Sequence, residues 1–251
     1  PTSGVAEIMS AANALAPLRP VLRWVAVFAV VEISVPWVLL SFAETRVSSA
    51  FAALMISATP LVGAVLAQAL RLDDRLHRTR LLGLALGVAG VAALVGLDLE
   101  VGGTVAVVAL VVTAVGYALG PIVVSTRLRD VPSVGVIAVS FLANAVLYLP
   151  FAVAQWPRTS VPMDAWVAIA ILGVLCTAIA FLIFFALIVE IGPTRMTVIT
   201  YVNPAVAVLL GIVVLGEPLT AGIAIGFPLV LLGSFLATRR APAMEDEPVP
   251  A

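Results

Sequence analysis

Eight long apolar runs limit what this chain can fold into. A helix that crosses a bilayer needs about 20 mainly apolar residues, within a range of roughly 17–25. Runs of this kind occupy residues 24–42, 49–70, 81–97, 103–125, 134–154, 165–189, 196–215 and 221–237. A ninth run, residues 4–18, is shorter and carries Glu7 and Asn13, which makes it a marginal span. The sequence therefore predicts an all-α fold, a polytopic transmembrane helix bundle.

The composition also indicates that the chain lies in a membrane. The chain is 63% hydrophobic and 11% charged, whereas ordinary soluble domains are roughly 45–50% apolar and about 25% charged. A chain this long and this apolar cannot hide its surface in one water-soluble core, so the lipid bilayer is its expected partner.

The distribution of arginine predicts how the spans are oriented. The chain has no Lys, and all thirteen basic residues are Arg. Eight spans place eleven of them on the side of the C-terminus, namely Arg19, Arg23, Arg71, Arg75, Arg78, Arg80, Arg127, Arg129, Arg195, Arg239 and Arg240. Only Arg46 and Arg158 lie on the other side. Because cytoplasmic loops carry the excess of Arg, we expect a cell (plasma or inner) membrane protein whose C-terminus and disordered tail, residues 239–251, are cytoplasmic.

One sequence module occurs twice in the chain. Residues 57–75 read SATPLVGAVLAQALRLDDR, and residues 201–220 read YVNPAVAVLLGIVVLGEPLT. Aligning the Pro of each copy places an acidic residue of one turn on an acidic residue of the other, Asp73 on Glu217. A Gly-rich apolar run follows each copy, so the module is a helix containing Pro, an acidic turn and a Gly-spaced helix.

The loop charges predict that the two copies cross the membrane in opposite senses. The loop after the first copy is rich in Arg, and the loop after the second has none. Copies five spans apart imply two inverted five-span repeats, residues 1–97 and 98–238. The first repeat is then incomplete at its start, and the first residue, Pro1, suggests that the chain begins within a longer reading frame.

Matched prolines and spaced glycines indicate where the helices bend and pack. Pro-broken segments in corresponding halves are typical of transporters with a site between the halves, so we expect hinges at Pro60 and Pro204. Small residues one turn apart let helices approach closely. Packing within the bundle is the favoured role of these glycines, and a homodimer face is the alternative: Gly83, Gly87, Gly90, Gly222, Gly226 and Gly233.

Few polar side chains lie inside the spans, and they are the candidate site residues. Glu32 is the only acidic residue near the middle of a strong span, and no Arg lies in these spans to pair with it. A carboxyl at that depth suggests a substrate or proton pathway, with simple burial in protonated form as the alternative. Four more residues are candidates for the pathway or for interhelical hydrogen bonds: Tyr117, Asn144, Tyr201 and Asn203.

The reactive side chains do not form a catalytic or metal-binding pattern. The single cysteine, Cys176, lies in an apolar run, and the single histidine, His77, lies in a charged loop. We therefore expect no catalytic residues, no metal site, no cofactor and no nucleic-acid partner.

The repeated motifs resemble those of the drug/metabolite transporter superfamily, in its EamA-like branch. The resemblance rests on TPLVGAVL and GLALGVAG, then on YVNPAVAVLLGIVVLGEPLT and GFPLVLLG. The second copy fits closely, while RLDD replaces the usual Gly-Glu turn in the first. The resemblance implies ten spans with both termini cytoplasmic, which makes residues 4–18 similar to the second span and leaves the first absent. Many members carry an Arg in that second span, where this chain has Met9.

The resemblance implies secondary transport, commonly export of amino acids, metabolites or toxic compounds, often coupled to protons. A small-molecule carrier is thus the first interpretation, and the chain is not expected to be an enzyme. A membrane-embedded enzyme or a non-transporting scaffold is the alternative. The enzyme would need His, Asp or Ser clustered at a membrane face, and the sequence shows no such cluster.

Overall fold

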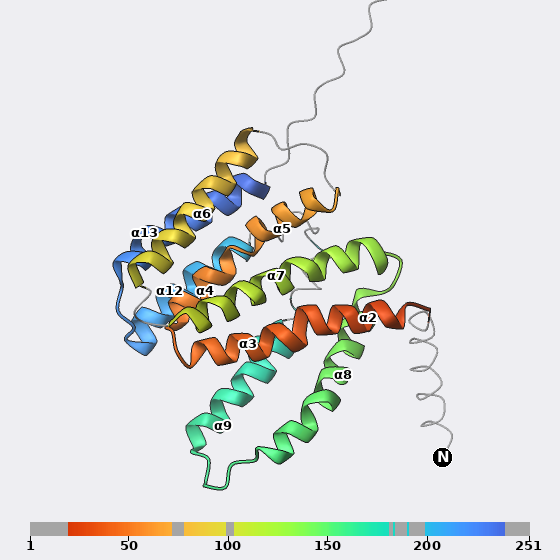
Figure 1. Ribbon diagram of the computed structural model, residues 1–251. Coiled ribbons are helices and arrows are strands. Elements are labelled where there is room, and N and C mark those ends of the chain that lie inside the picture. The colour runs from red at the N-terminus through yellow and green to blue at the C-terminus, as the bar shows by residue number, and fades with distance from the viewer. Residues whose placement is uncertain are drawn as a thin grey trace, which may run out of the picture.

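In the described part of this computed structural model, every regular element is a helix (Figure 1). The description covers residues 20–71, 78–98, 103–180, 183, 190 and 199–238. The elements are α2 (Leu22–Phe28), η2 (Ala29–Ser34), α3 (Val35–Glu44), α4 (Ser49–Ser57), α5 (Thr59–Ala69), α6 (Arg78–Asp98), α7 (Gly103–Arg127), α8 (Ser133–Ala154), α9 (Met163–Ala170), η4 (Ile171–Ile179), α12 (Ile199–Leu215) and α13 (Ala221–Thr238).

Among the described residues, six helices, some built from consecutive elements, are long and apolar enough to cross a membrane. Each lies on one of the predicted runs: Leu22–Glu44, Ser49–Ala69, Arg78–Leu97, Gly103–Arg127, Val134–Ala154 and Ala221–Thr238. Two shorter apolar helices, Met163–Ile179 and Val202–Leu215, lie on the remaining two runs. Residues 181–182, 184–189 and 196–198 of those runs fall outside the described residues, so the count of eight stays a prediction. Residues 4–18, Asp73, His77 and the tail also fall outside them.

The central core is made of small and branched side chains from several spans. Ala43, Ala50, Leu54 and Leu110 are completely buried there. Residues of α6, α12 and α13 complete this core, namely Leu94, Val208 and Ile223. Elements from both ends of the sequence therefore share one apolar centre.

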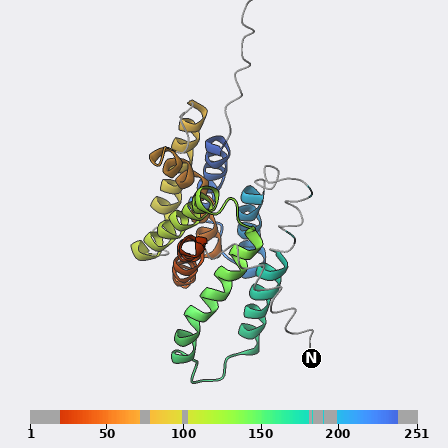
Figure 2. The same cartoon turned by 90° about the vertical axis from the view of Figure 1, so that its right-hand side faces the viewer.

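The helices α6 and α13 lie side by side in both views (Figures 1 and 2). A Cβ on Gly83 would lie 2.7 Å from the Gly233 carbonyl oxygen, and a Cβ on Gly226 would lie 3.0 Å from the Gly90 carbonyl oxygen. Only hydrogen fits at such approaches, so the two backbones are in direct contact. Gly87 contacts Leu61 and Gly233 in the same region, and Gly222 is also buried on α13. These glycines therefore pack α6 against α13 within one chain.

The span Ser49–Ala69 is interrupted just before Pro60, where α4 ends and α5 begins. Proline cannot donate the hydrogen bond that the Ile56 carbonyl would receive in a continuous helix. The Thr59 hydroxyl donates to that carbonyl at 2.6 Å, and the Ser57 hydroxyl donates to the Leu54 carbonyl at 2.6 Å. The Ser234 hydroxyl on α13 donates to the Ser57 carbonyl at 3.1 Å. Hydroxyl groups thus satisfy the carbonyls at the break, as an apolar environment requires.

Pro204, the matched residue of the second copy, lies inside α12, which runs through it without interruption. Its side chain is buried, and α12 packs along α4. The two matched prolines therefore differ in their local effect. Both lack an amide donor, but only Pro60 comes shortly after a residue outside the helix, Ala58.

The pair formed by α8 and α9 extends away from the rest of the helices, as Figure 2 shows. None of the residues of α9 and η4 is buried. Two tryptophans meet where α8 and α9 are joined, with the ring centroids of Trp156 and Trp166 6.1 Å apart. Exposed apolar faces of this kind are suited to contact with lipid.

Candidate functional site

The predicted site residue Glu32 lies in a π-helical turn in the middle of the first described span. The turn η2 joins α2 and α3 without a break, and the Val35 amide donates to the Val30 carbonyl, five residues back. A π-helical turn inserts one extra residue into a helix and frequently occurs at functional sites. It changes the direction of the side chains on η2 relative to those of α2.

The carboxyl of Glu32 lies against α7. A Cβ on Gly120 would meet the Glu32 carboxyl group, and a Cβ on Gly116 would lie 2.8 Å from the Pro36 side chain. These two glycines leave a shallow space on α7 that receives the π-helical turn. Within it, Oε2 of Glu32 is buried and has no hydrogen-bond partner among the described residues.

The other side of η2 is hydrogen-bonded to α8. The Ser34 hydroxyl lies 2.6 Å from Oδ1 of Asn144 and 3.1 Å from the Ala29 carbonyl, so it donates to one of them at a time. Nδ2 of Asn144 donates to the Ser140 carbonyl at 2.8 Å, and the Tyr148 hydroxyl donates to the Ser34 carbonyl. Ser34, Ser140 and Asn144 are all buried. The turn is therefore held between a glycine surface on α7 and a polar surface on α8.

Aromatic side chains adjoin this turn. Tyr117 is half-buried on α7, three residues before Gly120, and lies close to the Trp37 side chain of α3. Trp37 is 40% exposed and packs against Phe141 of α8, with ring centroids 5.7 Å apart. Aromatic groups from three helices thus lie next to the region that holds the Glu32 carboxyl.

The structure places the predicted site residues in two groups. The first group is at η2: Glu32 lies within this turn, Tyr117 lies next to it on α7, and Asn144 lies next to it on α8. Tyr201 and Asn203 lie on α12, which packs against α4, and the Asn203 side chain is exposed. The first group offers a titratable carboxyl, an amide and hydroxyls, which are the groups needed to bind a proton or a polar substrate.

Three polar residues near η2 were not predicted from the sequence. Ser140 and Tyr148 lie four residues before and after Asn144, and residues four apart share one face of a helix. Ser34 is two residues from Glu32. The Ser140 hydroxyl is buried and finds no hydrogen-bond partner in the described part of the chain. The four-residue spacing of Ser140, Asn144 and Tyr148 was the signal in the sequence that could have identified this polar face of α8.

A second carboxyl, that of Glu217, caps the start of α4. Its Oε1 accepts from the Ser49 amide at 2.7 Å and its Oε2 from the Ala50 amide at 3.0 Å. The Ser48 hydroxyl accepts from the Phe51 amide at 3.1 Å. The first amides of a helix have no partner within it, and negative charge is favourable at that end. The acidic turn of the second copy therefore joins the end of α12 to the start of α4.

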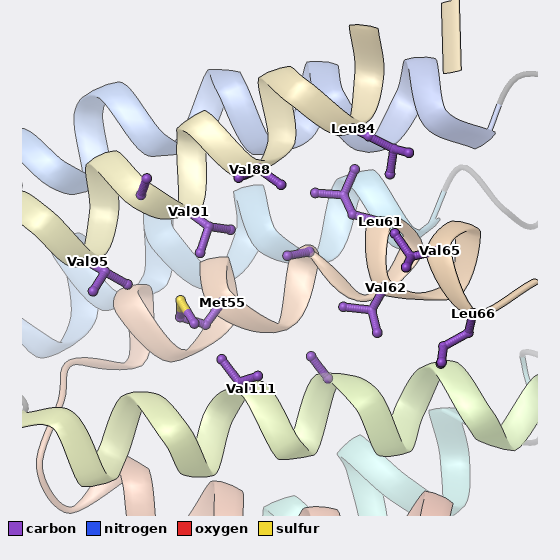
Figure 3. A pocket seen from close by; sticks show the side chains of 13 residues that line it. Met55, Leu61, Val62, Val65, Leu66, Leu84, Val88, Val91, Val95 and Val111 are labelled. Atoms are coloured by element: carbon purple, nitrogen blue, oxygen red, sulfur yellow. The ribbon is translucent and has the colours of Figure 1, made fainter. Parts of the chain in front are cut away.

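A separate apolar cavity of about 540 Å³ lies between α4, α5, α6 and α7. Figure 3 shows side chains such as Met55, Leu61 and Val91 pointing into it. All thirteen residues that line it are apolar. Sites for polar molecules combine apolar walls with a few polar groups that fix orientation. The cavity lacks such groups in its lining, so the region around η2 is the better candidate for selective binding.

The described residues contain no group of three His, Cys, Asp or Glu side chains placed to hold a metal ion. Cys176 is exposed on η4, and His77 falls outside the description.

Comparison with known proteins is consistent with this arrangement. A model of the EamA-like transporter family matches residues 8–96 and 104–239. A protein of Escherichia coli K12 named "Uncharacterized inner membrane transporter YedA" is 26% identical over 254 residues, covering 96% of this chain and 82% of the relative. Proteins of the same name from the O6:H1 and O157:H7 strains match to the same extent.

Proposed function

The chain belongs to the EamA-like transporter family, and on that premise we propose that it is a secondary-active carrier that exports a small metabolite, amino acid or drug-like compound in exchange for protons. The inner membrane named for the relative supports a location in the cell membrane. The two family matches support a division into repeats at residues 1–97 and 98–238.

One observation carries the proposal: Oε2 of the Glu32 carboxyl is buried and has no hydrogen-bond partner among the described residues. An ionised carboxylate in an apolar environment is strongly unfavourable without a charge or hydrogen-bond partner. The group is therefore stable there when it holds a proton, or when a substrate supplies the missing donor. A carrier that exchanges a proton for a substrate needs a group that binds either one but not both at once, and this carboxyl meets that requirement.

The helices around Glu32 give its occupancy a way to affect the structure. The turn η2 contacts α7 through the two glycines and contacts α8 through Ser34. A change of charge or volume at Glu32 alters the contact of η2 with α7, whereas hydrogen bonds hold the contact of η2 with α8. A ligand shifts a conformational equilibrium only by binding its states unequally, and the unequal contacts of η2 supply that difference.

The proposed orientation places both Arg71–Arg80 and the C-terminus in the cytoplasm, as the arginine bias indicates. A single Cys introduced at Thr79 in a Cys176→Ala background should be protected from a membrane-impermeant maleimide in intact cells. Labelling of that Cys from outside would contradict the orientation.

Transport by the Glu32→Gln variant tests the coupling. The Gln side chain keeps the shape and hydrogen-bonding capacity of Glu but cannot titrate. Proteoliposomes containing the full chain and a trapped pH-sensitive dye should show proton movement when amino acids and organic amines are added as a panel. The variant should lose that proton movement, whereas Glu44→Gln, at the exposed end of the same span, should retain it. Transport by Glu32→Gln with unchanged pH dependence would refute the coupling.

A further inference from the structure

Two arginines from different helices lie close to one tryptophan at one end of the bundle. The guanidinium carbon of Arg23 on α2 is 5.5 Å from the centroid of the Trp24 ring, and that of Arg127 on α7 is 4.6 Å from it. The two spans that carry them start and end here, and α2 and α7 are adjacent in Figure 1. The three side chains will be called the Arg23–Trp24–Arg127 group.

The positive charges of this group are not neutralised by a carboxylate in the described part of the chain. Neither Arg23 nor Arg127 takes part in a described salt bridge, and both are exposed. The neighbouring carboxylate of Asp130 is bonded to Arg129 at 3.4 Å, with both side chains largely in solvent. Two cations held beside one ring without a counter-charge form a positive site that is open to an external anion.

The geometry of a guanidinium over an aromatic ring favours a phosphate as that anion. Contact with the ring uses the face of the planar guanidinium and leaves its N–H donors, which lie in the plane, available. Those donors match a phosphate in paired hydrogen bonds. Arginines supplied by two helices can bind one phosphate from two directions.

The surroundings of the group fit a lipid rather than a dissolved anion. Trp24 packs against an apolar cluster that contains Val25, Phe28 and Leu128. Leu22, next to Arg23, is 50% exposed. Tryptophan at the end of a span is typical of the membrane interface, which is the depth of the lipid headgroup. An acyl chain would run along the apolar side chains while the phosphate met the arginines.

We propose that the Arg23–Trp24–Arg127 group is a binding site for the phosphodiester headgroup of an anionic phospholipid. Basic pockets between transmembrane helices are known to take such headgroups. The bound lipid would join the start of the first described span to the end of α7. That position is at the opposite end of α2 from the turn η2.

The proposal is tested by fluorescence of Trp24 in the full chain. The other tryptophans, Trp37, Trp156 and Trp166, are replaced by Phe, and the protein is placed in phosphatidylcholine nanodiscs. Brominated phosphatidylglycerol, added as a minor component, should quench Trp24 as strongly as about tenfold more brominated phosphatidylcholine. Arg23→Gln and Arg127→Gln should each lower this preference about fivefold, the factor expected for the loss of one arginine that contacts the anionic headgroup directly.

Controls separate the site from general charge attraction. Arg129→Gln removes the same charge from the same end of the bundle and should leave the preference unchanged. Arg23→Lys with Arg127→Lys keeps the charge, loses the planar donors and should give an intermediate preference, which also shows that the chain tolerates substitution here. Inorganic phosphate at constant ionic strength should not displace the lipid. Equal quenching by the two lipids, an unchanged preference in the double Gln variant, or displacement by inorganic phosphate would each overturn the proposal.

Discussion

Glu217 and Glu32 are both carboxylic acids that contact another helix, but their hydrogen bonds differ. Both oxygens of Glu217 accept from backbone amides at the start of α4. Oε2 of Glu32 is buried against α7, and no described residue forms a hydrogen bond with it. A carboxylate whose two oxygens both accept hydrogen bonds stabilises one arrangement of the helices. A carboxyl oxygen without a hydrogen-bond donor can instead take a proton or a ligand. The comparison therefore supports a structural role for Glu217 and is the basis of the transport role that we propose for Glu32.

The largest change in stability should follow Glu217→Ala. The substitution removes two charge-assisted hydrogen bonds and leaves the amides of Ser49 and Ala50 without an acceptor. We expect the free energy of unfolding to fall by about 2–4 kcal/mol. Thermal unfolding in detergent, followed by intrinsic fluorescence, measures the change. An unaltered melting temperature would mean that the cap is unimportant.

A smaller effect is expected for Glu217→Gln, which retains one acceptor oxygen but loses the charge at the helix start. The expected loss is about 1–2 kcal/mol, since the favourable charge–dipole contribution and one strong bond are removed. Transport by this variant should keep its normal pH dependence at a temperature where it is folded. Loss of pH dependence here would remove the distinction between the two acids.

Gly120→Ala disturbs the space that receives the Glu32 carboxyl. The added methyl group would overlap that carboxyl, which is the end of a flexible side chain and can turn aside. We expect a loss of about 1 kcal/mol or less in stability, because helix propensity favours Ala over Gly, together with a large loss of transport. Gly96→Ala on α6 is the matched control, because no atom lies within 4 Å of its added Cβ. Equal transport by the two variants would show that the position of Glu32 is unimportant.

The smallest change in stability is expected for Glu32→Gln. No described hydrogen bond is lost from Oε2, and a buried group that titrates is replaced by a neutral one. The melting temperature should stay within a few degrees of the original, while proton coupling disappears. A fall in stability as large as that of Glu217→Ala would show that Glu32 has an essential structural role.

Six of the spans could be predicted from the sequence, because a span depends on local hydropathy. The helix Val134–Ala154, for example, has the same bounds in sequence and structure. The depth of Glu32 within its span could be predicted for the same reason, while its role in transport stays a prediction. The partners of the acidic and polar groups could not be predicted, because they lie far away along the chain. Glu217 bonds to an amide 168 residues distant, and Ser34 to a side chain 110 residues distant.

The π-helical turn and the cap also lack a local signal. A π-helical turn differs from an α-helix only in which carbonyl accepts each amide, and AVVEIS has no residue that forces the change. The packing of Gly116 and Gly120 against the turn selects it, and this packing exists only in the folded bundle. Similarly, the alignment of Asp73 with Glu217 identified the acidic turn without revealing which helix start it serves.

The close contact of α6 with α13 has a consequence for biosynthesis. The glycines of α6 leave the ribosome about 140 residues before those of α13, which at roughly 5–20 residues per second is a delay of the order of ten seconds. During that time the glycine face of α6 has no native neighbour from α13, and lipid or the insertion machinery must cover it. Ribosomes stalled before residue 221 should therefore yield a chain whose α6 is accessible to crosslinking, and release of the last helix should abolish that accessibility.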